Sequence, residues 1–204
     1  MLTPEQKKYR DRANRARREL FKEKETFGAA RDGSGKRYRV CVYYVMSGAP
    51  EKAVEFLQWF SEEFPDDVGE PVFLLHAALA YRRTGQQQPA TRYLVDAMLS
   101  NLYLLPYLYG KPLARQDIWH SSNWSDTTYI AQVDDLLDTP TGEERMWFKS
   151  MFESELFTAL RNYYIETFHA LLDTRDVEQR QQLLEQWHAF YHVTLGPGDN
   201  TVDR

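Results

Sequence analysis

The chain has 204 residues, of which 43% are hydrophobic and 27% charged, a composition that supports a folded core. Its longest apolar run, residues 40–46, is far shorter than the roughly 20 residues of a membrane-spanning helix, so no membrane contact is predicted. The first residues lack the apolar stretch of a signal peptide, and we expect a cytoplasmic protein. The single cysteine, Cys41, excludes an internal disulfide and argues against a cysteine-rich zinc site.

Charge is unevenly distributed along the chain. The net charge is −5, but residues 1–40 carry 13 Lys and Arg against 6 Asp and Glu, which leaves the remainder strongly acidic. Such a split fits a basic arm for an acidic partner, or a basic helix that lies on the acidic surface of its own chain. We favour the second interpretation.

Residues 1–28 read as one basic N-terminal helix. Thr3, Pro4 and Gln6 provide a cap, a proline at the first helical position and a side chain that can return a hydrogen bond to the cap. The apolar stripe on this helix is narrow, so we expect it to dock on a core rather than form one. A glycine-rich stretch at residues 28–36 predicts the first break.

Residues 36–104 show a helix–turn–helix pattern twice. Small and large apolar residues alternate in the second copy and recur in the first copy, 37 residues earlier. The second copy contains Ala77, Ala78, Tyr81, Gly85, Ala90, Leu94 and Ala97, and the first contains Val40, Cys41, Tyr44, Gly48, Ala53, Leu57 and Phe60, followed by Pro65. This order resembles the tetratricopeptide repeat, a 34-residue helix pair. The resemblance implies an all-α fold with about two such pairs.

The likeness has departures. The tryptophan of the repeat's first helix is absent from both copies, and Phe60 stands where the repeat has a small residue. The segment Asn101 to Leu113 also looks like one that follows a repeat in bacterial relatives of the suppression-of-tumorigenicity family. That second likeness implies little about activity.

The second half of the chain is predicted to be helical after a long connection. Pro and Gly place this connection at residues 105–125, and helices are expected over residues 126–195. We predict one helix that is capped by Ser125 or Asp126 and runs to about Leu137. A longer one, opened by a capping box at Thr141, carries an aromatic face from Phe148 to Leu171. Asp173 or Thr174 is expected to cap the last helix, and residues 196–204 to form a loose tail.

Few residues suggest chemistry. His188 and His192 are four apart, a spacing that lets two imidazoles bind one metal ion, but no third ligand is evident and the intervening residues lack the glutamate of a zinc protease. Buried packing accounts for His76 and for Cys41. Adjacent acidic pairs, such as Asp134 and Asp135, diverge on a helix and read as solvated charges. No cofactor is predicted.

The repeat resemblance also implies a binding surface. In the family, ligands lie along the concave face formed by the first helix of each pair. The matching positions here are Tyr38, Val42, Val45, Leu75, Leu79, Arg82 and Arg83. These residues are mostly apolar, whereas members that clamp a terminal carboxylate use lysine and asparagine. Because a stack of so few repeats needs caps, the flanking helices are candidates to fill this groove.

The leading hypothesis is a non-enzymatic helical scaffold or adaptor that binds a protein or peptide partner. Three alternatives stay open: an immunity-type inhibitor that blocks a basic toxin, a metal-dependent enzyme that uses His188 and His192, and nucleic-acid binding through the basic N-terminal helix. The acidic residues within that helix argue against nucleic acid. The sequence identifies neither the partner nor the oligomeric state.

Overall fold

The computed structural model describes residues 2–30 and 32–196, and every regular element within them is helical, which confirms the predicted all-α class. In chain order the elements are α1 (Pro4–Phe27), α2 (Lys36–Met46), α3 (Pro50–Glu63), α4 (Pro71–Arg83), α5 (Gln87–Ser100), α6 (Leu104–Leu108), η1 (Asn123–Ser125), α7 (Thr128–Val133), η2 (Asp134–Leu136), α8 (Gly142–Phe152), α9 (Glu155–Asp173) and α10 (Val177–Leu195). Among the described residues no helix is long and apolar enough to cross a membrane.

The chain divides into two compact units, and the boundary lies inside one helix. Unit 1 comprises the described residues up to Leu94, and unit 2 those from Val95 to Gly196. Helix α5 therefore contributes its first half to unit 1 and its second half to unit 2.

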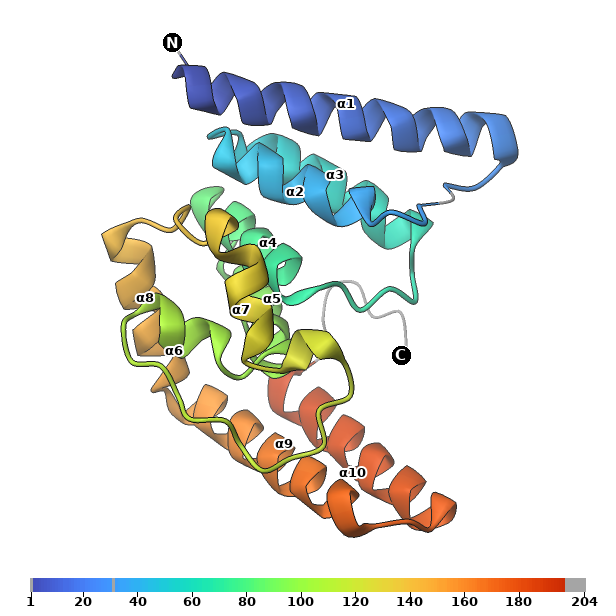
Figure 1. Ribbon diagram of the computed structural model, residues 1–204, viewed down its shortest axis with the longest axis vertical. Coiled ribbons are helices and arrows are strands. Elements are labelled where there is room, and N and C mark those ends of the chain that lie inside the picture. The colour runs from blue at the N-terminus through green and yellow to red at the C-terminus, as the bar shows by residue number, and fades with distance from the viewer. Residues whose placement is uncertain (1, 31, 197–204) are drawn as a thin grey trace. The chain divides into compact units, whose positions relative to one another are not determined.

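Helix α1 follows the predicted start and packs along α2 in unit 1 (Figure 1). The side chain of Thr3 accepts a hydrogen bond from the Gln6 amide, and the Gln6 side chain returns one to the Thr3 amide, which confirms the capping box. Ala13 and Leu20 are fully buried on its narrow apolar stripe. The helix thus docks against the core of unit 1, as the sequence predicts.

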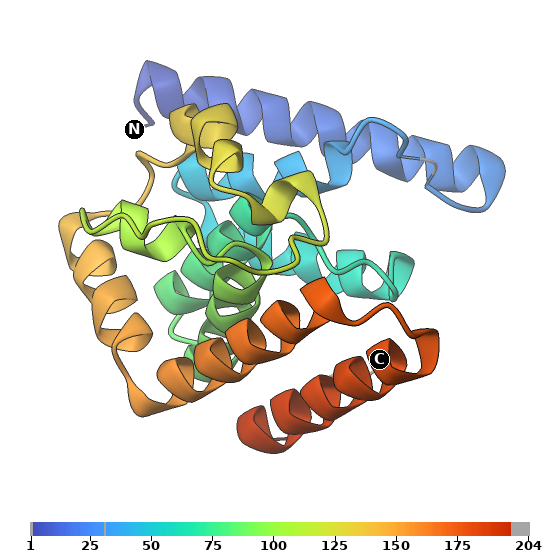
Figure 2. The same cartoon turned by 60° about the horizontal axis from the view of Figure 1, so that its bottom comes forward.

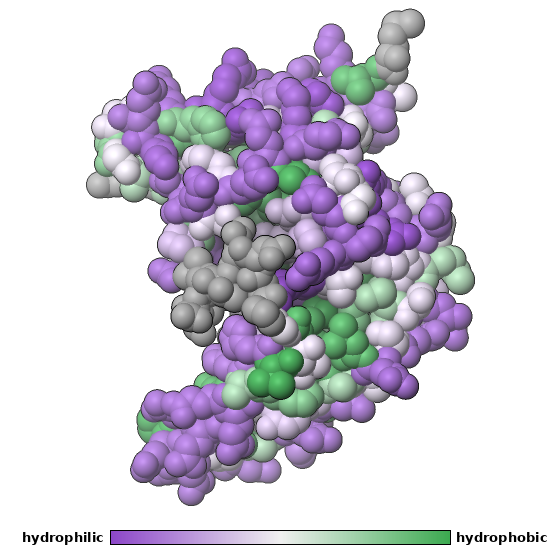
Figure 3. Space-filling model, turned by 180° about the vertical axis from the view of Figure 1, so that it is seen from behind, coloured by the Kyte–Doolittle hydropathy of each residue, from purple (hydrophilic) through white to green (hydrophobic). Residues whose placement is uncertain are grey.

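The outer face of α1 is polar, and two of its cations pair with another helix. Arg17 lies 2.6 Å from Glu55 of α3, and Lys24 forms an ion pair with Glu63 at the end of the same helix. These pairs support the interpretation that the basic segment lies on acidic residues of its own chain. The part of the space-filling view that α1 occupies is mostly hydrophilic (Figure 3).

Residues 36–100 contain the four helices α2, α3, α4 and α5; α2 packs on α3, and Tyr81 of α4 stacks on Tyr93 of α5. Gly48 and Gly85, at the two matching turns, have φ of 71° and 79° and so adopt the left-handed conformation that favours glycine. Helices α2, α3 and α4 pack against one another within unit 1. All residues from Pro71 to Ala80 are buried, so α4 is the central helix of this unit.

Phe60, which departs from the repeat pattern, has a packing role. Its ring centroid lies 4.8 Å from that of Phe73 and 6.3 Å from that of Tyr38, so the three rings form one cluster between α2, α3 and α4. A small residue at position 60 would leave part of this space empty. The departure is therefore compensated by aromatic packing.

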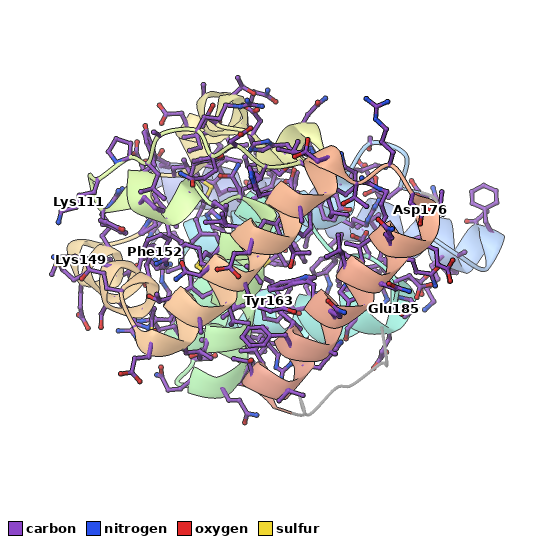
Figure 4. The ribbon with its side chains drawn as sticks, turned by 90° about the horizontal axis from the view of Figure 1, so that it is seen from below. Lys111, Lys149, Phe152, Tyr163, Asp176 and Glu185 are labelled. Carbon is purple, nitrogen blue, oxygen red and sulfur yellow. The ribbon has the colours of Figure 1, made fainter. Side chains whose placement is uncertain are left out.

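In unit 2, α9 and α10 form an antiparallel pair that lies side by side in two views (Figures 1 and 2). Tyr163 of α9 stacks on Phe190 of α10 with centroids 4.4 Å apart, and Figure 4 shows its side chain between the two helices. Trp187 is the buried residue of α10. Helix α6 packs on α8, which precedes this pair.

The predicted helix that Ser125 or Asp126 caps, running to about Leu137, is divided into two elements. The side chain of Asp126 accepts hydrogen bonds from the Thr127 hydroxyl and the Thr128 amide, and its backbone is extended. Helix α7 therefore begins only at Thr128. It ends at Val133, where the tighter turn η2 takes over.

Two further boundaries differ from the prediction. Thr141 forms the expected capping box, but the chain breaks after Phe152 and Ser154 caps a separate helix, α9. The Ser154 side chain accepts a hydrogen bond from the Phe157 amide, which satisfies a donor that a continuous helix would pair along its own backbone. The last helix is capped by Asp176, not by residue 173 or 174. Of the predicted tail, residues 197–204 lie outside the described residues.

Candidate binding pocket

The groove positions implied by the repeat resemblance are mostly buried. Tyr38, Val42, Val45, Leu75 and Leu79 all lie in the core, while Arg82 and Arg83 are half-buried. An Arg83 guanidinium nitrogen donates to the backbone oxygen of Val45 at 3.3 Å. A partner can reach the five buried side chains only after they are uncovered, so a role for these residues in binding stays a prediction.

The hydroxyl of Tyr38 belongs to a polar cluster at the start of α2. It donates to Asp67 at 2.8 Å and accepts from Arg37 at 2.9 Å, and Arg37 also donates to the second oxygen of Asp67 at 2.6 Å. Burial, followed by the hydrogen bond to Asp67, raises the pKa of Tyr38 to about 12. These contacts fix the loop before α4 against α2, and they account for the polar groups of Tyr38 without a ligand.

The residues considered for metal or acid–base chemistry do not converge. His188 and His192 are exposed on α10, and among the described residues no group of three His, Cys, Asp or Glu side chains has the arrangement of a metal site. His76 is buried with Nδ1 2.8 Å from the Val72 oxygen. Burial raises the pKa of the Cys41 thiol, which disfavours a reactive thiolate.

A pocket of about 430 Å³ lies in unit 2, between α6, α7 and the connection that joins them. We call residues 109–122 of this connection the strap. Apolar side chains form most of the wall, with three hydroxyls and one carboxylate among them. The lining residues are Tyr103, Tyr107, Pro112, Leu113, Thr127, Ile130, Ala131 and Asp134. Its size falls in the range of about 300–1,000 Å³ typical of ligand sites.

The strap is held at Tyr103 by a chain of hydrogen bonds. The Gln116 amide donates to the Tyr103 hydroxyl at 2.8 Å, and this hydroxyl lies 3.0 Å from Nε2 of His120. Because Nδ1 of His120 lies 3.0 Å from the Ile118 oxygen, which can only accept, Nδ1 carries a proton and Nε2 of a neutral ring accepts from Tyr103. Each of these groups thus helps to position the strap.

The middle of the strap is also held by Asp126, which pairs with Arg115. Arg115 donates to its carboxylate at 2.9 Å, and Asn101 donates to its backbone oxygen at 3.1 Å. The hydrogen bond from Arg115, followed by that from the Thr128 amide, lowers the pKa of Asp126 to about 2. The carboxylate therefore stays ionised and keeps the strap attached to the start of α7.

Helix α9 supports the strap from another direction. The Trp119 amide donates to the Phe168 oxygen at 2.9 Å, and the two rings stack. Nδ1 of His169 lies 2.7 Å from the Asp117 oxygen. A connection held at so many points is pre-organised, so the pocket wall that it supplies need not be ordered by a ligand.

The rim of the pocket combines an aromatic ring with a carboxylate. The Tyr107 hydroxyl donates to Oδ1 of Asp134 at 2.8 Å, and this bond is the main cause that raises the pKa of Tyr107. Tyr107 is 41% exposed and Leu113 is 37% exposed, so the apolar wall continues to the surface. Such a site can bury one apolar side chain and attract a positive charge at its edge.

Sequence reasoning missed this pocket. The sequence indicates a Pro- and Tyr-rich segment from Asn101 to Leu113 and a long connection after it. Nothing in either predicts that the strap folds back onto α7. The signal was the concentration of large apolar residues in an otherwise irregular connection, because such loops are often functional.

Comparisons of the chain with protein-family models, with curated proteins and with solved structures gave no match.

Proposed function

We propose that the protein is a non-enzymatic binding module that takes a peptide segment of a partner protein into the strap pocket. The observation that carries this proposal is a pre-organised pocket with apolar walls and an exposed rim, built by a strap that is hydrogen-bonded to Asp126 through Arg115 and to Tyr103 through Gln116. Of the polar groups around it, the Tyr103 hydroxyl and Asp126 hold the strap, and the apolar wall favours binding over catalysis.

The shape of the pocket favours a peptide over a small metabolite. Small-molecule sites usually bury about 70–90% of their ligand, whereas the wall formed by Tyr107 and Leu113 opens to solvent. An open pocket of this volume suits a single anchoring side chain whose backbone continues across the surface. Burial of one such anchor supplies most of the affinity in many peptide interfaces.

The test is a peptide-library selection on the purified full chain, with one variant that fills the pocket. Ala131 lines the pocket and is exposed on α7, so Ala131→Trp should reduce binding of selected peptides at least tenfold by occupying the space of the anchor. Ala189 is exposed on α10 away from the pocket lining, and Ala189→Trp is the matched control. Peptides that bind both variants equally would refute the proposal.

A further inference from the structure

The carboxylate of Asp134 is held with one oxygen engaged and the other available. Oδ1 accepts the hydrogen bond from Tyr107, while Oδ2 has no hydrogen-bond partner among the described residues. Asp134 lines the pocket and its side chain is exposed. Asp134 is thus held at the rim by Oδ1, and Oδ2 can accept a hydrogen bond from a ligand.

The charge around this rim is negative. Residues 126–138 contain Asp126, Asp134, Asp135 and Asp138 and no lysine or arginine. Asp126 is paired with Arg115, whereas the other three aspartates are exposed and form no ion pair among the described residues. Asp134 and Asp138 both act electrostatically on the Tyr107 hydroxyl, so a cation that approaches the rim meets more than one carboxylate.

The nearby cations offset only part of this charge. Arg145 is half-buried and donates to the backbone oxygens of Leu108 and Leu137, and its positive charge also acts on the Tyr107 hydroxyl at the rim. Lys111 of the strap lies at the same edge of unit 2 as Lys149 of α8 (Figure 4). Neither lysine forms an ion pair with Asp134.

We propose that the strap pocket recognises an apolar side chain followed by an arginine, with the apolar side chain between Leu113 and Ile130 and the arginine against Tyr107 and Asp134. This inference rests on the proposed function and specifies its ligand. A guanidinium can stack on the exposed Tyr107 ring while it donates to Oδ2 of Asp134, and both interactions use its planar shape. Lysine carries the same charge but lacks the planar guanidinium, so we expect lysine peptides to bind more weakly than arginine peptides.

The experiment measures binding of fluorescein-labelled hexapeptides to the full chain. The central pair consists of Leu, Phe or Trp followed by Arg, Lys, Gln or Glu, and the flanking residues are Gly and Ser. We expect Arg peptides to bind about fivefold more tightly than Gln peptides and Glu peptides to bind most weakly, because rim ion pairs contribute modestly. Raising the NaCl concentration from 0.05 to 0.5 M should reduce the preference for Arg.

The decisive variant is Asp134→Asn, which keeps an acceptor for Tyr107 but removes the charge. We expect it to reduce the preference for Arg over Gln to about twofold, because binding of Arg peptides weakens more than binding of Gln peptides. Asp135→Asn is the matched control, because this aspartate is exposed and outside the pocket lining. An unchanged preference in Asp134→Asn would overturn the inference.

The outcomes separate this inference from the proposed function. If Ala131→Trp reduces peptide binding but the peptides show no preference for a basic neighbour, the proposed function stands and the inferred preference for arginine is refuted. No Ala131→Trp-sensitive peptide binding at all refutes both. A concentration-dependent dimer of the wild-type chain that is lost in Ala131→Trp would show that a second copy occupies the pocket, which also overturns the inference.

Discussion

At the scale of single residues, Gly69 is the most restricted glycine in the part of the chain that the structure describes. It has a φ of 75°, and a Cβ at this position would lie 2.9 Å from Cδ1 of Phe73 and 3.0 Å from Cδ2 of Leu74. The Phe73 ring is fully buried in the aromatic cluster of unit 1 and has little room to move. Glycine is therefore required here both by backbone conformation and by space.

We expect Gly69→Ala to lower the free energy of unfolding by about 2–3 kcal/mol, from left-handed backbone strain and steric overlap together. Gly85→Ala is the matched control, because Gly85 has a φ of 79° but no atom within 4 Å of the added Cβ. It should cost only about 1–2 kcal/mol, from the backbone alone. Urea unfolding of both variants measures the difference, and equal losses would show that the overlap at Gly69 is relieved at no cost.

Asp126 gives a pH-dependent prediction. Its pKa in the folded chain is about 2, below the ordinary value of 3.8, so the stabilisation it provides is complete above about pH 4 and is lost as the pH falls toward 2. Asp126→Asn should lower the free energy of unfolding by about 1 kcal/mol at pH 7, because the pair with Arg115 is partly solvated. Urea unfolding at pH 7 and at pH 2.5 should show this difference shrinking with acidification. Asp135→Asn, which removes a solvated carboxylate, should show no such trend, and a pH-independent loss in Asp126→Asn would contradict the assignment.

At the scale of elements, one arginine joins three segments of unit 2. Arg145 of α8 donates to the oxygen of Leu108 at the end of α6 at 2.7 Å, to Leu137 after η2 at 3.1 Å and to Pro140 at 3.3 Å. These carbonyls lie at the ends of short elements and have few backbone donors available to them. Arg145 therefore replaces the helical hydrogen bonds that the short elements lack.

Removal of this arginine should loosen the pocket as well as the fold. We expect Arg145→Ala to lower the free energy of unfolding by about 2–3 kcal/mol, since hydrogen bonds to a charged donor contribute more than neutral ones. Amide hydrogen exchange should rise in α6 and α7, the elements on either side of the pocket. Arg175→Ala, at an exposed position before α10, is the control. A loss below about 0.5 kcal/mol would show that water replaces the guanidinium without cost.

The positions of helices could be predicted where apolar periodicity and turn residues agreed. The predicted helix boundaries were wrong where a tertiary contact or a capping residue sets the end of a helix. Residues 36–100 combine periodic apolar positions with turn glycines, and four helices with turns at Gly48 and Gly85 are found there. Ser154 lies between two aromatic stretches with one helical periodicity, so the sequence pattern does not predict that it caps a new helix. The pocket depends on contacts of Tyr103 and Asp126 with residues distant in the sequence, and apolar periodicity does not predict such contacts.

At the scale of the whole chain, α5 belongs to both units. Ala90 and Leu94 are fully buried in its first half, and Val95, Ala97 and Met98 are fully buried in its second half. If unit 1 unfolded alone, the part of α5 after Leu94 would remain as a short helical segment, and isolated helices shorter than about 12–15 residues are marginal in water. Loss of that segment would then uncover core residues of unit 2. The two units are therefore expected to unfold together.

This coupling can be tested with a defect confined to unit 1 and a signal confined to unit 2. Trp59 is the tryptophan of unit 1, so in a Trp59→Phe background the fluorescence comes from residues 119, 124, 147 and 187 alone. Leu20→Ala, which truncates a fully buried side chain of α1, should cost about 3 kcal/mol. We expect the urea midpoint to fall equally in fluorescence and in far-ultraviolet circular dichroism. A fluorescence midpoint that stayed in place while the dichroism midpoint fell would show that α5 does not couple the two units, and that unit 2 with its pocket is stable independently of unit 1.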